Sequence, residues 1–180
     1  MNKLLGKHLC AAAALLLLWG AQAVRAEAID GVWGMSFGDP CEKANQVLVE
    51  KNGAQLICQY EYTADYKEAF YKVDFWGREG HLLLRFSRKG LFLARFAFIR
   101  ERDLPESAEG ADSVWLSSHY RELRAMLAKK YGDPAETIEQ NNAPRGELWG
   151  DPSGQCISLF ESRSLSRSDT VMSYEDRDRR

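Results

Sequence analysis

The chain has 180 residues, 45% of them hydrophobic, with 24 basic and 26 acidic residues. That length is enough for one domain with a proper core. Basic and acidic residues are interspersed without a basic block, which argues against nucleic acid as a partner.

The start of the chain has the layout of a signal peptide. Lys3 and Lys7 precede an apolar run, Leu9 to Trp19, that is too short to span a bilayer as a stable helix. We expect cleavage after Ala26, so that Glu27 begins the mature chain; an uncleaved anchor is the alternative. No later segment of the sequence is long and apolar enough for a membrane span. The mature protein is therefore expected to be periplasmic or secreted.

The mature chain opens with GVWGMSFGDPC, which matches the pattern G-x-S-x-G around Ser36. In hydrolases this pattern exposes a nucleophilic serine at a turn between a strand and a helix. Such an enzyme needs a parallel sheet already laid down before the motif, and here roughly nine mature residues precede it. Asp39 is instead expected to cap a helix that has Pro40 at its first position, and Asn52-Gly53 can end this helix. A serine hydrolase using Ser36 therefore ranks last among the functions considered.

Strand patterns follow this first helix. Segments 55–62 and 70–76 are strand-like, and segment 81–99, HLLLRFSRKGLFLARFAFI, predicts a hairpin with the three-residue loop Arg88-Lys89-Gly90. The loop places a row of core residues opposite one another. These are Leu82, Leu84 and Phe86 on the first strand and Phe96, Ala94 and Phe92 on the second.

The other face of this hairpin mixes apolar and cationic side chains, which we call the outer-face patch. It consists of His81, Leu83, Arg85, Leu93, Arg95 and Ile99, together with Ala97. Such a patch is costly to leave bare in water. Either the second half of the chain or its helix packs over the patch, or a partner protein binds it through the arginines and large apolar residues.

The second half of the chain repeats the order of the first. A charged segment, 101–111, predicts a linker, and a helix from Ser113 to Tyr131 is stopped by Gly132-Asp133-Pro134. Four strand-like pieces follow. They are 135–140, 146–150, 155–161 and 170–174.

This order predicts an α+β fold. Two helix-plus-antiparallel-sheet halves pack as one compact unit, with the helices on one face of the sheet. The expected boundaries are a signal peptide at 1–26, a first half at 27–104, a second half at 105–174 and a charged, frayed tail at 175–180.

The mature cysteines are Cys41, Cys58 and Cys156. Export implies oxidising conditions, so one disulfide is expected. We favour Cys41–Cys58, because the first helix and the strand returning beside it can bring the two together; Cys58–Cys156 is the next choice. No zinc site is expected, because no ligands stand at a recognisable spacing, and we expect no cofactor. Trp33, Trp76, Trp115 and Trp149 are interpreted as core or core-edge residues rather than a sugar platform.

The opening string G-V-W-G-M-S-F-G-D-P-C-E-K-A and the later runs at 127–134, 148–151 and 157–159 resemble a family of small exported bacterial domains. These are similar to the SmpA/OmlA-type outer-membrane assembly lipoproteins and to the β-lactamase-inhibitor-protein fold. The resemblance implies helices covering one face of an antiparallel sheet and a role in protein binding, and it supplies no catalytic residue. The assembly lipoproteins carry an acylated cysteine, and this sequence has no lipobox.

The function predicted first is therefore a non-enzymatic, exported protein-binding or envelope-assembly module whose partner is an unknown envelope protein. The alternative is a small-ligand-binding periplasmic protein that uses the cationic outer face or the cleft between the halves.

Overall fold

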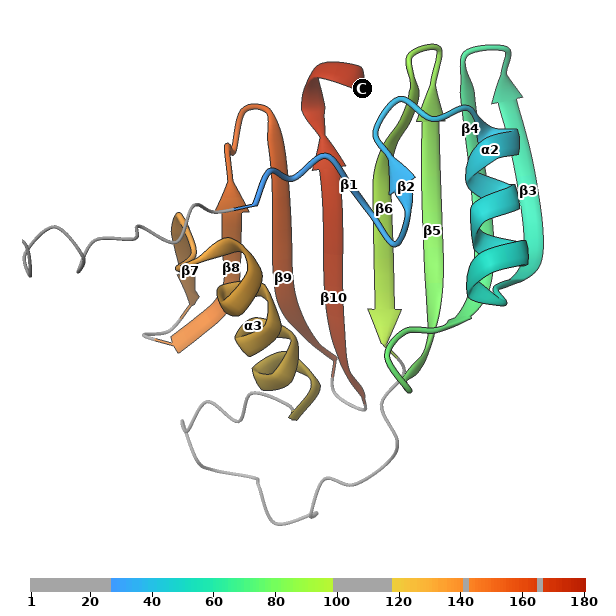
Figure 1. Ribbon diagram of the computed structural model, residues 1–180. Helices are drawn as coiled ribbons and strands as arrows, with labels where there is room; N and C mark the ends of the chain where they lie inside the picture. Colours follow the sequence, from blue (N-terminus) through green and yellow to red (C-terminus); the bar gives the residue numbers. More distant parts are fainter. Residues whose placement is uncertain (1–26, 99–117, 141–142, 165–166) are drawn as a thin grey trace, which may run out of the picture.

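The computed structural model describes residues 27–98, 118–140, 143–164 and 167–180 (Figure 1). The expected signal peptide, the linker, the boundary between residues 104 and 105, and Ile99 lie outside these ranges.

An eight-stranded antiparallel sheet forms most of the described molecule (Figure 1). Its first four strands are β3 (Gln55–Thr63), β4 (Tyr66–Asp74), β5 (Glu79–Ser87) and β6 (Gly90–Phe98). Its last four are β7 (Glu136–Gln140), β8 (Ala143–Gly150), β9 (Gln155–Ser164) and β10 (Arg167–Asp176). The spatial order is β3-β4-β5-β6-β10-β9-β8-β7, so two meanders meet where their last strands pair.

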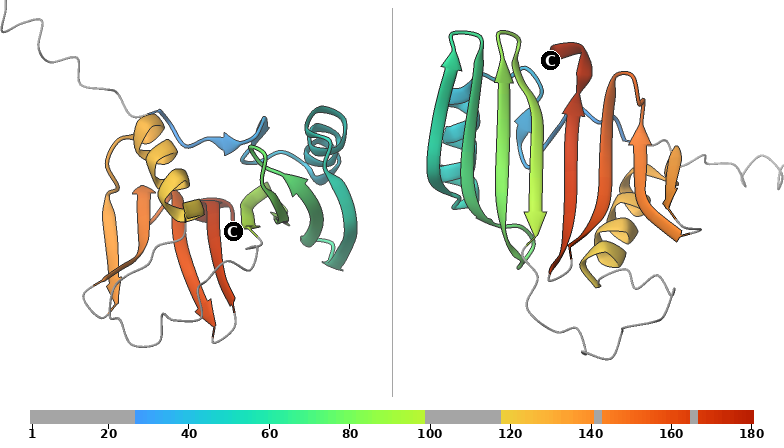
Figure 2. Two further views of the ribbon diagram at one scale, coloured as in Figure 1. Left: turned by 90° about the horizontal axis from the view of Figure 1, so that it is seen from below. Right: turned by 180° about the vertical axis from the view of Figure 1, so that it is seen from behind.

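Two short helices and a small ribbon complete the described fold. Helix α2 (Cys41–Gln46) continues into a π-helical turn (Val47–Lys51) near the β3 end of the sheet, and α3 (Ser118–Tyr131) lies near the β7 end. Between them runs the two-stranded ribbon of β1 (Gly31–Val32) and β2 (Met35–Ser36) (Figure 2). A single buried cluster joins side chains of both helices, the ribbon and both meanders.

The predicted fold class, α+β with two helix-plus-sheet halves and helices on one face of the sheet, is wrong. The protein is mostly β, with one large antiparallel sheet and helices too short to form a layer of their own. Apart from the β1–β2 ribbon, which was not expected, the order of helices and strands along the chain is as expected. The difference arises at the centre, where Phe96 of β6 pairs with Met172 of β10 and makes the two sheets one.

The predicted hairpin is correct in its strands and wrong at its tip. Leu82 faces Phe96 and Leu84 faces Ala94 as expected. The loop, however, has two residues between the paired Ser87 and Gly90, and an irregularity after the Arg85–Leu93 pair leaves Phe92 as the extra residue. The ring of Phe92 therefore packs against Tyr66 instead of facing Phe86.

The expected Cys41–Cys58 disulfide is not formed, and the three cysteines of the described chain are free thiols. Tyr71 of β4 donates to Asn45 of α2, so the side chain of Tyr71 faces that helix. A bulge in β3 separates Leu56, which pairs with Tyr71, from Cys58, which pairs with Phe70. Successive residues point to opposite faces, so Cys58 lies on the face turned away from α2 and Cys41.

The last residues do not form a frayed tail. Strand β10 continues to Asp176, and a 3-10 turn (Arg177–Arg179) follows. Asp176 accepts a hydrogen bond from the backbone amide of Asp178 and forms a salt bridge with Arg179 at 3.1 Å. Ser87, at the tip of the β5–β6 hairpin, donates to the carbonyl of Arg179. The C-terminus is thus held against the first meander.

Candidate functional site

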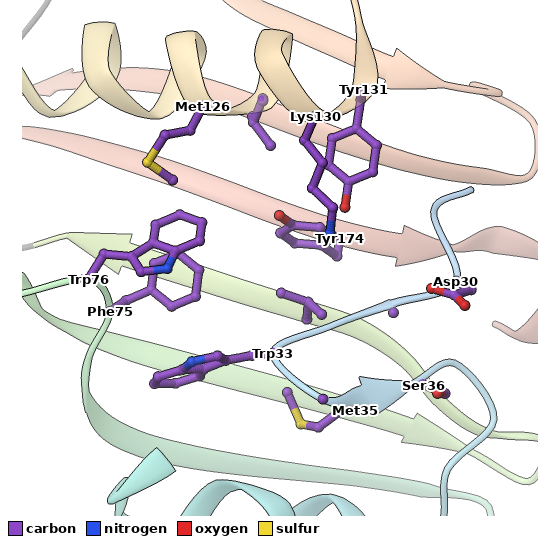
Figure 3. Close-up of a pocket in the computed structure, with 14 residues that line it drawn as sticks. Asp30, Trp33, Met35, Ser36, Phe75, Trp76, Met126, Lys130, Tyr131 and Tyr174 are labelled. Atoms are coloured by element: carbon purple, nitrogen blue, oxygen red, sulfur yellow. The ribbon is translucent and has the colours of Figure 1, made fainter. Parts of the chain in front are cut away.

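A cleft of about 450 Å³ opens between α3 and the β1–β2 ribbon (Figure 3). Its volume is within the range of small-molecule binding sites. The ribbon, the loop after β4, the inner surface of α3 and Tyr174 of β10 all contribute to its lining. The cleft therefore draws on segments from both halves of the sequence.

Two tryptophans reach this cleft from turns of the same kind. Trp33-Gly34 connects β1 to β2, whose flanking residues Val32 and Met35 pair with each other. Trp76-Gly77 connects β4 to β5, and Phe75 and Arg78 on either side exchange two backbone hydrogen bonds. All four turn residues have positive φ: 56° and 83° in the first turn, 55° and 75° in the second. Positive φ at both central positions is what a type I′ hairpin turn requires.

Aromatic rings form one end of the cleft. The ring of Phe75 lies 5.1 Å from that of Trp33 and 3.9 Å from that of Trp76, measured between centroids. Phe96 of the sheet lies 4.4 Å below Phe75. The thioether of Met126 on α3 points toward Trp76 (Figure 3). This end of the cleft is apolar and is built on buried rings.

Polar side chains gather at the other end. Lys130 of α3 places its Nζ 5.0 Å from the centre of the Tyr131 ring and 3.5 Å from an oxygen of Glu27. Burial, with Tyr131 as a charge and hydrogen-bond neighbour, raises the pKa of Tyr174 far above its ordinary value. Tyr174 therefore keeps its proton at neutral pH. Asp30 and Ser36 lie farther out along the ribbon (Figure 3).

Ser36 lies at the rim of this cleft and not in a catalytic arrangement. Its backbone N–H donates to Asp39 Oδ2 at 2.9 Å, and Asp39 Oδ1 pairs with Lys43 at 2.8 Å. The expected capping role of Asp39 is wrong, since α2 begins without a side-chain cap. Among the described residues, no hydrogen bond links the Ser36 hydroxyl to a histidine. The ring of His119 lies beside Phe98, and His81 pairs with Ala97 on the sheet.

The members of the outer-face patch that the structure describes lie on one face of the sheet, as expected. Ile99 is outside the described residues. The register pairs His81 with Ala97, Leu83 with Arg95 and Arg85 with Leu93. Leu93 is only 2% exposed. Its cross-strand neighbours are Arg85 on one side and Glu175 on the other, and both carry long side chains. Leu93, a member of the outer-face patch, is thus shielded from solvent.

Both arginines of the patch have partners within the described chain. Arg95 Nε donates to Ser173 of β10 at 3.1 Å, and Arg85 Nε pairs with the buried Glu68 at 2.8 Å. Glu68 also accepts from the hydroxyls of Tyr62 and Tyr66, at 3.3 and 2.9 Å. The patch is therefore largely an internally satisfied polar network on the sheet surface.

Sequence reasoning missed Trp33 and Trp76 as site residues. The signal was the repeated dipeptide Trp-Gly between two strand patterns. Asparagine, aspartate or glycine normally occupies the first position of such turns, so a tryptophan there is unusual. Their convergence on one cleft depends on the position of the ribbon above the sheet, which no local pattern contains.

Within the described ranges, no group of three or more His, Cys, Asp or Glu side chains is placed to hold a metal ion. No helix in these ranges has the length and apolarity needed to cross a membrane. Comparisons with protein-family models, with curated proteins and with solved structures gave no match. The resemblance to the assembly lipoproteins and the inhibitor-protein fold therefore remains a prediction from the sequence.

Proposed function

We propose that this is a non-enzymatic, exported binding protein that takes a small, partly apolar ligand into the cleft between α3 and the β1–β2 ribbon. The observation that carries the proposal is the pair of tryptophans, Trp33 and Trp76, at strained turn positions that both line this cleft.

The backbone strain at these two tryptophans is the reason for assigning them a role in function. A left-handed backbone costs a residue with a large side chain about 1–2 kcal/mol relative to the ordinary helical region. Burial of the side chain can offset such a cost. Trp76 contacts Phe75 but remains 55% exposed, so its own packing offsets only part of the cost. An exposed aromatic ring held in a strained turn over an apolar cleft supports a role in contacting a ligand.

The variant Trp76→Asn tests the proposal. Asparagine tolerates the turn, and the strain that it relieves offsets the lost contact with Phe75, so we expect the free energy of unfolding to change by less than about 1 kcal/mol. The loss of a ring contact should weaken binding of the neutral probe N-phenyl-1-naphthylamine about fivefold. Urea unfolding and probe fluorescence measure the two effects.

Tyr62→Asn is the matched control, because Tyr62 is 59% exposed and lies outside the cleft. It should leave probe affinity unchanged. The proposal fails if Trp76→Asn binds the probe like the native protein, or if Tyr62→Asn weakens binding as much.

Protein binding is the second candidate function. It is favoured by the edge strand β3, which exposes four large apolar or aromatic side chains: Leu56, Ile57, Tyr60 and Tyr62. The rings of Tyr60 and Tyr62 stack with centroids 6.0 Å apart. Exposed aromatic residues on a sheet edge are typical of surfaces that contact another protein. This candidate takes precedence if the cleft does not bind the probe.

A further inference from the structure

We propose that the ligand of this cleft is an anionic amphiphile, with its apolar body against Trp76 and Met126 and its negative charge at Lys130. This inference rests on the proposed function and specifies the class of ligand.

The cleft has chemically distinct ends. Trp33, Phe75, Trp76 and Met126 gather at one end, and Lys130, Tyr131 and Tyr174 lie at the other (Figure 3). An apolar ring or chain is stabilised at the first end by leaving water. A single polar group attached to that body then falls beside Lys130.

Lys130 supplies the charged hydrogen-bond donor of this polar end. The Lys130 ammonium is a donor without acceptor capacity. Tyr174 is buried, and its hydroxyl stays protonated at neutral pH, where it interacts with Tyr131. A carboxylate, sulfonate or phosphate offers acceptors to the lysine and gains a charge-assisted hydrogen bond from it.

The acidic groups near the cleft do not block an anion. Glu27 contacts Lys130 at 3.5 Å, but the side chains of both residues are more than half exposed, so the pair is weak and can open. Asp30 is exposed and comes directly before β1. It lies farther from the aromatic end than Lys130 does (Figure 3). None of the residues lining the aromatic end is acidic, so that end offers a cationic ligand no carboxylate.

Two fluorescent probes that share one ring system test the inference. N-phenyl-1-naphthylamine is neutral, and 1-anilinonaphthalene-8-sulfonate carries one sulfonate. With the protein purified after export, we expect the sulfonate to bind with a Kd about tenfold lower than that of the neutral probe. Lys130→Gln should abolish this difference. Glu27→Gln, which releases Lys130 from its carboxylate, should strengthen binding of the sulfonate.

Lys129→Gln is the matched control. It removes the same charge from the next residue of α3, which does not line the cleft, and should leave the preference for the sulfonate intact. Near-ultraviolet circular dichroism confirms that each variant is folded.

The inference is overturned if both probes bind the native protein equally well, or if Lys129→Gln and Lys130→Gln have the same effect. Those outcomes leave the proposed function standing, since the apolar end still binds. Failure of both probes to bind at all removes the proposed function itself. Competition by sodium laurate alone indicates a free acid, and competition by phosphatidylglycerol vesicles as well indicates a lipid; both support an anionic amphiphile.

Discussion

Cys41 and Cys156 are buried on opposite faces of the sheet, whereas Cys58 is partly exposed. Burial, with Glu42 nearby, raises the pKa of the Cys41 thiol, and burial raises that of Cys156. A raised pKa leaves less thiolate at a given pH, and the thiolate is the reactive form. The surroundings of the three cysteines thus predict that their thiols differ in reactivity.

We therefore expect iodoacetamide at pH 8 to modify Cys58 in the native protein well before Cys41 and Cys156. Mass spectrometry of tryptic peptides at successive times measures the order. In urea all three should react at similar rates. If Cys41 and Cys58 both resist alkylation in urea until a reductant is added, a disulfide joins them and the separation by the sheet is refuted.

At the scale of elements, α3 is held to the sheet by an ion pair between the partly exposed Arg124 and a buried carboxylate. Glu147 of β8 is 3% exposed and accepts from Arg124 at 2.8 Å and from the Tyr120 hydroxyl at 3.4 Å. Burial of the carboxylate is tolerated because these donors replace its water. Since α3 forms one wall of the cleft, this contact positions Met126 and Lys130 as well.

Arg124→Ala should lower the free energy of unfolding by about 2 kcal/mol, because Glu147 is left buried without its guanidinium partner. Arg121→Ala, an exposed position on the same helix, should change it by less than about 0.5 kcal/mol. Urea denaturation of the two variants gives the comparison. Equal effects would mean that helix propensity or net charge, and not the ion pair, accounts for the change.

At the scale of the whole molecule, the two halves share one sheet and one core. β6 pairs with β10 through six residues of each strand, from Leu93 to Phe98 and from Thr170 to Glu175. Phe96 and Met172, partners across this seam, are both fully buried. If one half unfolded alone, the seam of the other half would be exposed to water. Unfolding of either half is therefore expected to destabilise the other.

We expect one cooperative unfolding transition. Tryptophan fluorescence reports on Trp33 and Trp76 in the first half and on Trp115 and Trp149 in the second, and far-ultraviolet circular dichroism reports on the sheet. The two signals should share one urea midpoint. Separate midpoints would show that the halves unfold independently despite the continuous sheet.

Most of the local structure follows from the amino-acid sequence alone. Periodicity and turn residues predicted the order of helices and strands, the end of α3 at Gly132, and the facing pairs Leu82–Phe96 and Leu84–Ala94. These features depend on neighbours within a few residues, which the sequence displays directly.

Other features of the fold depend on contacts between distant parts of the chain. Bulges at Ile57 and Phe92 reversed the faces of Cys58 and Phe92, and the β6–β10 pairing made one sheet of two expected sheets. The cleft combines Trp33, Trp76 and Lys130 from segments far apart in the chain. Strand pairing and register are set by contacts between distant segments, and a shift of one residue turns a side chain to the opposite face, so local patterns do not contain this information.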